Sequence, residues 1–279
     1  MKSAKFSSFW SRAILYLLMS IGGLFVLFPF FWMVLVALKP DSEVFALNLK
    51  LIHPLWKNFL DILHDPSYPF GRFFINSLLV ATVGAGLTTL ICAFGGYAFA
   101  KKNFYGKEAL FWALMATMMI PGMMFLVPQF ALVTRFHWIN TYQGMIVPHL
   151  ANVFGLFLMR QYMETIPDSL LEAARIDGAS ELQIFWRIIM PLSITIVTML
   201  FLLSFLFHWS NFLWQLVVNT PESDKLTLPI GLALFKGQYT AEYAKMMAAA
   251  CFSIIPIAVI FLFAQKFFIE GLTAGAVKE

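Results

Sequence analysis

Charged residues are scarce in this sequence. Only 12% of its 279 residues are charged, whereas 60% are hydrophobic and the mean hydropathy is +0.78. A soluble globular domain carries about a quarter charged residues. The composition therefore excludes a soluble enzyme with one large core and predicts an all-α polytopic membrane protein embedded in a lipid bilayer. The net charge of +4 is small and dispersed, so no nucleic-acid partner is expected.

Cysteine is also scarce, and motifs for catalysis or metal binding are absent. Cys92 and Cys251 both lie in apolar runs, where a free thiol acts as a small hydrophobe, and they provide no disulfide framework or zinc spacing. There is no HExxH or GxSxG motif and no pair of carboxylates. A methionine-rich stretch around Pro121 could bind a soft metal, but flexible packing beside a proline kink is favoured. We expect no catalytic residue, no metal site and no cofactor bound by this chain.

Long apolar runs divide the chain, because a transmembrane helix needs about 20 apolar residues. Six such runs lie at residues 13–38, 73–100, 109–134, 136–159, 192–218 and 246–265. The first is too long for a signal-peptide core and has no small-residue cleavage site after it, so an uncleaved anchor is expected. Six spans place both termini on one side of the membrane. The excess of lysine and arginine on that side, with Lys101, Lys102 and Lys107 in one short turn, predicts that it is cytoplasmic.

These spans predict the organisation of the whole chain. A short helix near residues 56–63 is expected in the first outside loop, which is otherwise rich in proline. The expected parts are a cytoplasmic N-terminus at 1–12, a first transmembrane helix at 13–38, an outside loop at 39–72, a core transmembrane domain at 73–266 and a cytoplasmic C-terminal tail at 267–279.

Asp, Glu, Lys and Arg are absent from the six apolar runs. Carriers coupled to ions or protons place such residues inside the membrane, where they are costly enough to mark function. Only His137, His149 and His208 remain as candidates, and the favoured interpretation is that they are hydrogen-bonded histidines near the membrane interface. Any energy for transport therefore has to enter from outside the spans.

The charged segment at residues 164–191 is the exception in this apolar chain. Its sequence, ETIPDSLLEAARIDGASELQIFWRIIMP, predicts two short amphipathic helices. Pro167 suits the first position of a helix, and Gly178 suits a left-handed residue just past its end. Ser180 and Gln183 have the spacing of a capping box that starts the second helix. That helix places Leu182, Phe185, Trp186 and Ile189 on one apolar face, and Pro191 limits its continuation.

The same segment resembles the EAA signature of permeases from ATP-binding-cassette (ABC) importers. The residues that carry the resemblance are EAA at 172–174, DGA at 177–179 and IMPL at 189–192. The runs WSNFLW at 209–214 and LPIGL at 228–232 and the ending GLTAGAVK at 271–278 are similar to the carbohydrate-uptake branch, the group of the smaller maltose permease. One departure is Phe212, where many relatives carry an acidic residue, so the resemblance assigns no role to that position.

The resemblance implies a fold, partners and site residues. It implies the type I ABC importer permease fold with a cytoplasmic coupling helix, in the plasma (inner) membrane of a prokaryote. The partners would be a second homologous permease subunit, a dimer of ATPase subunits that bind ATP and Mg, and an extracytoplasmic substrate-binding protein. Two sets of residues would meet the ATPases: a coupling set of Glu172, Ala173, Ala174, Asp177, Gly178 and Pro191, and a tail set of Gly271, Thr273 and Gly275.

Asn211, Trp214 and Gln215 are the candidates for the translocation path. Their spacing of i, i+3 and i+4 places them on one face of a helix, and they combine an aromatic ring with hydrogen-bonding groups that suit a sugar. Helix packing and an interfacial aromatic belt are the alternative interpretation. A di- or oligosaccharide is the favoured cargo, and glycerol phosphate or another sugar-like solute is the alternative. The hypotheses from other classes, a stand-alone carrier or channel and a membrane-embedded enzyme, have less support in the sequence.

Overall fold

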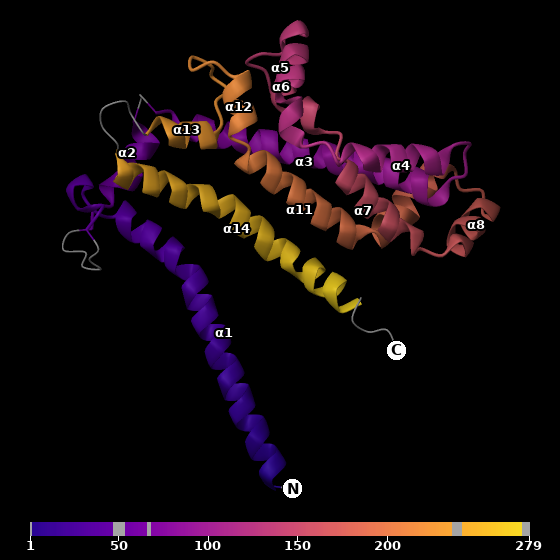
Figure 1. Cartoon of the computed structure of the whole chain (residues 1–279), viewed down its shortest axis with the longest axis horizontal. Coiled ribbons are helices and arrows are strands. Elements are labelled where there is room, and N and C mark those ends of the chain that lie inside the picture. Colours follow the sequence, from indigo (N-terminus) through magenta and orange to yellow (C-terminus); the bar gives the residue numbers. More distant parts are fainter. Residues whose placement is uncertain (1, 47–53, 66–67, 236–241, 275–279) are drawn as a thin grey trace. The chain divides into compact units, whose positions relative to one another are not determined.

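The computed structural model describes the backbone of residues 2–46, 54–65, 68–235 and 242–274, and the side chains within these ranges from residue 11 to residue 265. This part of the chain consists of helices and their connections, without strands. It divides into two compact units, one of Met1–Phe70 with Leu232–Ile255 and one of Gly71–Gly231 with Pro256–Glu279. Figure 1 labels the elements.

The first unit joins the N-terminal helix to the start of the last one. Its elements are α1 (Lys2–Ala37), η1 (Asp41–Glu43), α2 (Lys57–His64) and the beginning of α14 (Tyr243–Ala274). Val36, Val44 and Ala244 form a small core, and the backbone N–H of Ala244 donates to Asp41 Oδ1 over 3.0 Å. These contacts hold the start of α14 against the segment that follows α1. The short helix expected near 56–63 is present as α2.

The second unit begins with the long helix α3 (Phe70–Lys101) and continues through shorter pieces. In chain order these are α4 (Lys107–Thr117), η2 (Gly122–Phe125), α5 (Leu126–Arg135), α6 (Tyr142–Ile146), η3 (Val147–His149), α7 (Val153–Glu164), α8 (Asp168–Ile176), α9 (Glu181–Ile184), η4 (Phe185–Ile189), α10 (Met190–Leu192), α11 (Ile194–Ser210), α12 (Leu213–Val218), the first part of α13 (Leu228–Leu234) and the second part of α14. Residues 2–12, expected as a cytoplasmic N-terminus, are helical and belong to α1.

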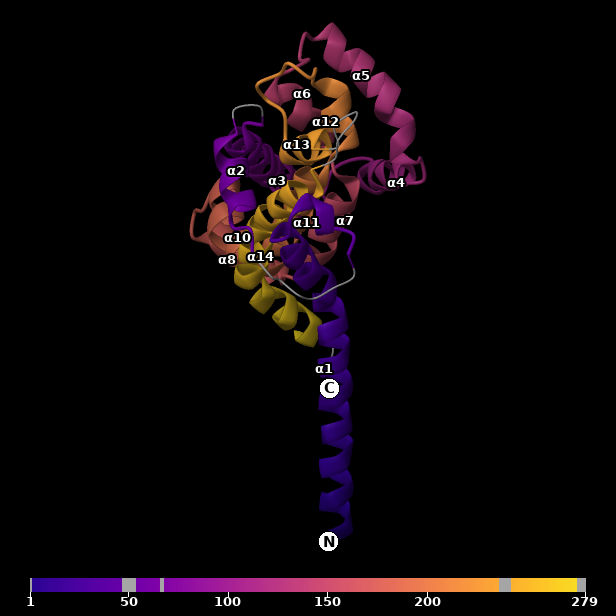
Figure 2. The ribbon, with the colours of Figure 1, turned by 90° about the vertical axis from the view of Figure 1, so that its left-hand side faces the viewer.

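Three helices of the described chain are long and apolar enough to cross a membrane: Ser11–Ala37, Phe70–Lys101 and Tyr243–Gln265. The other expected spans are bent pairs of helices. The bend is 90° between Lys107–Thr117 and Gly122–Arg135, which Figure 2 shows as the change of direction from α4 to α5. It is 51° between Tyr142–His149 and Val153–Glu164, and 81° between Glu181–Leu192 and Ile194–Ser210. The number of spans is therefore between three and six.

Two glycines let α3 and α7 approach closely. A Cβ atom on Gly96 would lie 2.4 Å from Met159 Cβ, and one on Gly95 would lie 2.4 Å from a methyl carbon of Leu156. The methyl group of Leu156 could move away from a side chain at position 95, but Met159 Cβ and the adjacent backbone could not, so this spacing of the two helices requires glycine at position 96. The close contact holds the end of α3 beside α7, and α8 lies beyond the end of α7 (Figure 1).

Candidate functional site

The charged segment folds as two short helices around a left-handed glycine. α8 ends where Gly178 adopts a φ of 81°, a conformation that glycine reaches without steric cost. Ser180 then caps α9, because its side chain accepts from the Gln183 N–H while the Gln183 side chain accepts from the Ser180 N–H. The expected turn and capping box are confirmed. Pro167 differs by one position, since it precedes the first helical residue rather than occupying it.

The second helix buries a face that differs from the expected one. It passes through a π-helical turn, Phe185–Ile189, which rotates the following residues relative to a regular α-helix. Ile184, Phe185 and Ile189 are buried, whereas Leu182 and Trp186 are exposed in this chain. Of the four residues expected on one apolar face, only Phe185 and Ile189 are therefore buried within this chain. The helix also continues through Pro191 to Leu192, and the 81° bend comes at Ser193.

Polar contacts hold the charged segment against the end of α3. Lys101 Nζ donates to Asp168 Oδ1 over 2.8 Å, at the start of α8. Tyr97 Oη donates to Glu181 Oε2 over 2.8 Å, at the start of α9. Lys102 also pairs with the Glu181 carboxylate, and Arg175 reaches the same carboxylate over 3.2 Å. These contacts tie both helices of the segment to one end of α3.

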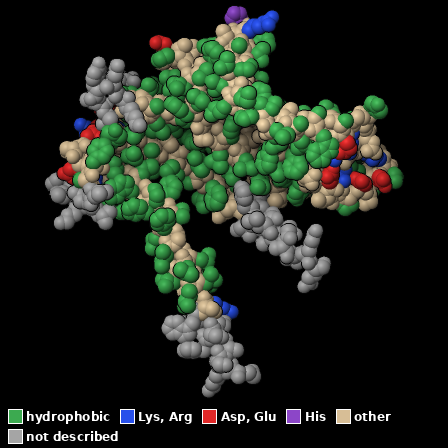
Figure 3. Space-filling view, viewed as in Figure 1, with side chains coloured by type: hydrophobic (Ala, Val, Ile, Leu, Met, Phe, Trp, Pro, Cys, Tyr) green, Lys and Arg blue, Asp and Glu red, His purple; other side chains and the backbone are tan. Residues whose placement is uncertain are grey.

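The charges gather at this end of the second unit. In Figure 3 red and blue side chains cluster over the region of α8, while neighbouring helices present hydrophobic surface. The ammonium group of Lys101 holds the pKa of Asp168 below its ordinary value, by a hydrogen bond and by charge. A negative charge at the first residue of α8 also suits the positive end of the helix dipole.

A second ion-pair cluster lies at the end of α7. The Arg160 guanidinium donates to Glu164 Oε1 over 2.8 Å and to Glu108 Oε1 over 2.9 Å. It also lies over the Phe111 ring, 3.8 Å from the ring centre. This arrangement joins α7 to the start of α4. It lies where α7 leads into α8, at the start of the charged segment.

The outer side of the charged segment is open. On the inner side of α8, Leu171 is buried. Among the coupling candidates, Ala174 is half-buried, and the exposed ones are Glu172, Ala173, Asp177, Gly178 and Pro191. Ile176, which sequence reasoning did not single out, is 86% exposed at the end of α8. It lies between Arg175 and Asp177, on the same open side as the exposed coupling candidates.

Asn211, Trp214 and Gln215 do not share one face of a helix. The helix α11 ends at Ser210, Asn211 is extended, and its Oδ1 accepts from the Trp214 N–H over 3.3 Å as α12 starts. The uninterrupted helix expected over 192–218 is therefore wrong, because the asparagine side chain offers the backbone a competing hydrogen bond. Asn211 and Trp214 line a cavity of about 650 Å³, but Gln215 is fully buried and does not.

Trp214 supports the cavity wall rather than offering a stacking surface. It is 3% exposed, its Nε1 donates to the Gly144 carbonyl over 3.0 Å, and its ring meets His149 edge to face. Gln129, His149 and Asn152 line the same cavity, and they were not predicted as path residues. Their shared signal in the sequence is a polar side chain next to a proline or at a break in an apolar run.

The three histidines differ from expectation in their surroundings. His208 of α11 is buried, and its ring occupies the space where a Cβ atom on Gly84 of α3 would lie. The centre of this ring is 6.4 Å from that of His149. Within the described chain, His208 Nδ1 and His149 Nε2 are buried without a hydrogen-bond partner. At one ring nitrogen of both His149 and His208, the hydrogen bond that the sequence suggested is therefore missing among the described residues. His137 is exposed and adopts a left-handed φ of 57°.

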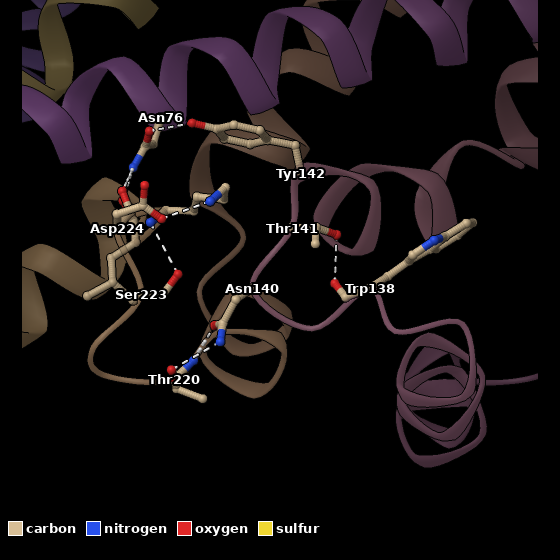
Figure 4. Close-up of polar contacts among 10 residues, drawn as sticks. Asn76, Trp138, Asn140, Thr141, Tyr142, Thr220, Ser223 and Asp224 are labelled. Carbon is tan, nitrogen blue, oxygen red and sulfur yellow. Dashed lines mark hydrogen bonds and ion pairs between the residues drawn. The ribbon is translucent and has the colours of Figure 1, made fainter.

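A polar network holds the loop that follows α12 (Figure 4). Asn76 of α3 is buried, and its Nδ2 donates to the carbonyls of Asp224 and Leu226 over 3.0 and 2.9 Å. Tyr142 Oη donates to Asn76 Oδ1 over 2.8 Å, and the Thr220 N–H donates to Asn140 Oδ1 over 2.8 Å. Sequence reasoning missed this network because its members are far apart in the chain.

Two further expectations concern the tail and metal binding. Gly271 and Thr273 lie in the last turn of helix α14, and their side-chain surroundings are not described; Gly275 lies outside the described residues. Among the residues that are described, no group of three or more His, Cys, Asp or Glu side chains could hold a metal ion.

Comparison with known proteins places the chain among transport components. Residues 88–272 match the family described as binding-protein-dependent transport system inner membrane component. The chain is 36% identical over 260 residues to the arabinooligosaccharides transport system permease protein AraQ of Bacillus subtilis (strain 168), covering 92% of each protein. It is 32% identical over 268 residues to the sn-glycerol-3-phosphate transport system permease protein UgpE of Yersinia pestis, covering 92% of this chain and 94% of the relative.

The fold is also similar to a solved structure. A chain of a bacterial ABC transporter involved in the import of the acidic polysaccharide alginate superposes with a TM-score of 0.80. The match covers 91% of this chain and 95% of the other, at 22% sequence identity. At this identity the likeness defines the fold and leaves the cargo open.

Proposed function

The chain belongs to the family of binding-protein-dependent transport system inner membrane components, and we propose that it is a permease subunit of an ABC importer for a di- or oligosaccharide. It works with a second homologous permease and with two ATPase subunits that bind ATP and Mg. A soluble binding protein delivers the cargo from outside. Each bent pair of helices forms one span, which makes six spans in the plasma membrane and leaves both termini cytoplasmic. The chain itself is not catalytic.

The charged segment at 164–191 carries this proposal. A coupling element has to move as a rigid body with its partner, because a flexible contact would absorb the motion that it should transmit. The ion pairs of Asp168 and Glu181 with the end of α3 supply that rigidity, and the buried Leu171 fixes the inner side of α8. The open outer side carries Glu172 and Ala173, where a small side chain lets another backbone approach. We therefore propose that α8 and the Gly178 turn dock on an ATPase subunit.

The sugar cargo is supported by the relatives rather than by the coupling segment. One relative is named for arabinooligosaccharides and another for sn-glycerol-3-phosphate, so a phosphate-bearing cargo is the second candidate. Asn211 and Trp214 remain proposed path residues through the cavity that they line, and Gln215, which is fully buried and next to Trp214 in the sequence, is proposed with them.

Charge reversal in the coupling segment tests the proposal. In an importer reconstituted with the partner permease, ATPases and binding protein, Glu172→Lys and Gly178→Asp should abolish uptake, while sugar still binds to the soluble protein. Glu43→Lys in η1 is the control, because it makes the same charge change outside the segment. Uptake by Glu172→Lys and Gly178→Asp at the wild-type rate would contradict the coupling role. Uptake without ATPase subunits would instead indicate a stand-alone carrier or channel.

The C-terminal tail is a second proposed contact with the ATPases. We propose that Gly271, Thr273 and Gly275 reach the ATPase subunits, because the similar ending in the maltose-type branch does so. Deletion of residues 273–279 should then weaken the stimulation of ATPase activity by the binding protein. Unchanged stimulation would leave these residues as an ordinary chain terminus.

A further inference from the structure

Three interruptions of apolar helices meet at one cavity. The cavity of about 650 Å³ is lined by residues from the α4–η2 break, including Met118, from the η3–α7 break, including Asn152, and from the α11–α12 break, including Asn211. Backbone at membrane depth can leave a helix only where protein covers it or where it lines a water-filled space. Three breaks at one cavity therefore indicate a hydrated path rather than a packing defect. A cavity of this size is also within the range of small-molecule sites, about 300–1,000 Å³.

The wall of the cavity offers hydrogen bonds but no formal charge. Its polar side chains are uncharged and include Gln129, Asn152 and Asn211, and none of its lining residues is Asp, Glu, Lys or Arg. Gln129 makes no side-chain hydrogen bond within the described chain. Asn152 and Asn211 each use Oδ1 to accept a backbone N–H, which leaves their Nδ2 groups to donate elsewhere. The wall therefore holds amide donors on side chains that the fold has fixed in place.

Aromatic rings complete the wall. Phe207 and Phe154 line the cavity, and each is about half exposed. His149 stands between Phe207 and Trp214, with both rings edge to face against it at 5.4 and 5.2 Å. The buried His149 Nε2 has no partner among the described residues, and an unpaired buried polar atom costs about 1–3 kcal/mol. A wall that retains such a group and combines exposed rings with amide donors resembles a ligand site more than a packing surface.

We propose that this cavity binds one unit of an uncharged sugar directly, with Gln129, Asn152 and Asn211 donating or accepting hydrogen bonds and Phe154 or Phe207 covering the apolar face of the ring. This inference rests on the proposed function and narrows its cargo to neutral carbohydrate. A carboxylate or phosphate taken from water into this cavity would lose hydration, and no cation of the wall would replace it. Neutral hydroxyl groups incur a much smaller cost and match the amides of the wall.

The first test compares two identical changes at different places. Gln129→Leu removes a polar side chain of the wall that makes no side-chain hydrogen bond within the described chain, so folding should be intact. Gln143→Leu is the matched control, because Gln143 is exposed on α6 and does not line the cavity. In the complete reconstituted importer, uptake of arabinotriose or maltotriose should fall roughly threefold to tenfold in Gln129→Leu, as expected for the loss of one hydrogen bond. Equal uptake by the two variants would overturn the proposal.

The second test determines whether the cavity binds neutral sugars in preference to anionic ones. A cysteine is placed at the site as Gln129→Cys in a Cys251→Ala background, and its rate of labelling by a thiol reagent is measured in the importer. Arabinotriose and maltotriose should slow labelling severalfold, whereas an alginate trisaccharide and sn-glycerol-3-phosphate should not. Protection by the anionic probes, or by none of the four, would overturn the inference. Failure of the proposed function is distinguishable, because the wild-type importer would then show no ATPase stimulation by its binding protein.

Discussion

Lys101, the last residue of α3, donates from Nζ to Asp168 Oδ1 over 2.8 Å, although the two residues are 67 positions apart. The lysine side chain is almost fully buried, whereas the aspartate is exposed. A buried ammonium group needs an acceptor, and Asp168 together with the carbonyl of Ile166 supplies it. The pair therefore joins the long helix α3 to the first turn of α8, where the proposed coupling segment begins.

This ion pair predicts a dependence on pH. The pKa of Asp168 is lowered in the folded chain by Lys101, so the pair contributes stability above the ordinary carboxyl pKa of about 4 and loses it as pH falls through the lowered folded pKa. Asp168→Asn should lower the melting temperature of the purified importer at pH 7, and the difference from wild type should shrink below pH 4. High salt should also reduce it, because the aspartate is exposed.

Asp177→Asn is the matched control for that measurement. Asp177 is exposed at the other end of α8 and forms no ion pair within the described chain. Its loss should leave the melting temperature unchanged at both pH values. A difference between Asp168→Asn and wild type that persists undiminished at pH 3 would contradict the assigned ion pair.

The left-handed glycine of the charged segment predicts an ordered series of variants. A Cβ at Gly178 would meet nothing within 4 Å, yet the φ of 81° disfavours any side chain, at roughly 1–2 kcal/mol. Gly178→Ala should therefore loosen the turn, and Gly178→Asn should do so less because asparagine tolerates this conformation. Hydrogen exchange of residues 168–184 and ATP-driven uptake measure the effect.

Gly106→Ala separates strain from coupling. Gly106 has a φ of 78° and equally open surroundings, but it lies outside the charged segment. Gly106→Ala should destabilise its own turn about as much as Gly178→Ala does, but it should leave the coupling between ATPase activity and uptake intact. If Gly106→Ala and Gly178→Ala impair uptake alike, the Gly178 turn has no special role.

The close approach of α3 to α7 predicts that alanine at two glycine positions of α3 changes stability differently. In Gly96→Ala the new methyl group would lie 2.4 Å from Met159 Cβ and 3.0 Å from the backbone nitrogen of Arg160. The two helices would have to separate, at about 1–3 kcal/mol. Gly86→Ala meets nothing within 4 Å and should be neutral. Thermal inactivation of the two variants compares them, and equal stability would show that α3 and α7 are not in close contact.

The network around Asn76 predicts a local effect on the loop after α12. Asn76→Leu would leave the carbonyls of Asp224 and Leu226 and the Tyr142 hydroxyl without their partner, at about 1–3 kcal/mol for unsatisfied buried groups. Limited proteolysis within residues 219–228 should become faster. Tyr142→Phe removes one of the three hydrogen bonds and should have a smaller effect. Unchanged proteolysis in Asn76→Leu would mean that the loop is held by other contacts.

Local features of the fold were predictable because their causes are local. The Gly178 turn and the Ser180 capping box depend on residues within four positions of each other, and the spacing of these residue types indicates them directly. The apolar face of the following helix was predicted only in part, because the π-helical turn at Phe185–Ile189 changes the periodicity. The interruption at Asn211 was missed, because a run without charged residues predicts one continuous helix. In the structure the Asn211 side chain accepts a hydrogen bond from the Trp214 N–H, and this bond competes with the helical hydrogen bonds of the backbone.

The sequence by itself determined that this chain is an apolar helical membrane protein with one charged segment, and that this segment resembles the EAA signature of ABC importer permeases. These properties follow from composition and from neighbouring residues. Tertiary structure alone decided that Lys101 meets Asp168, that Gln215 is buried while Asn211 reaches the cavity, and that three separate helix breaks line the same space. Such relationships depend on how whole helices pack, because the packing sets the distance between segments far apart in the chain.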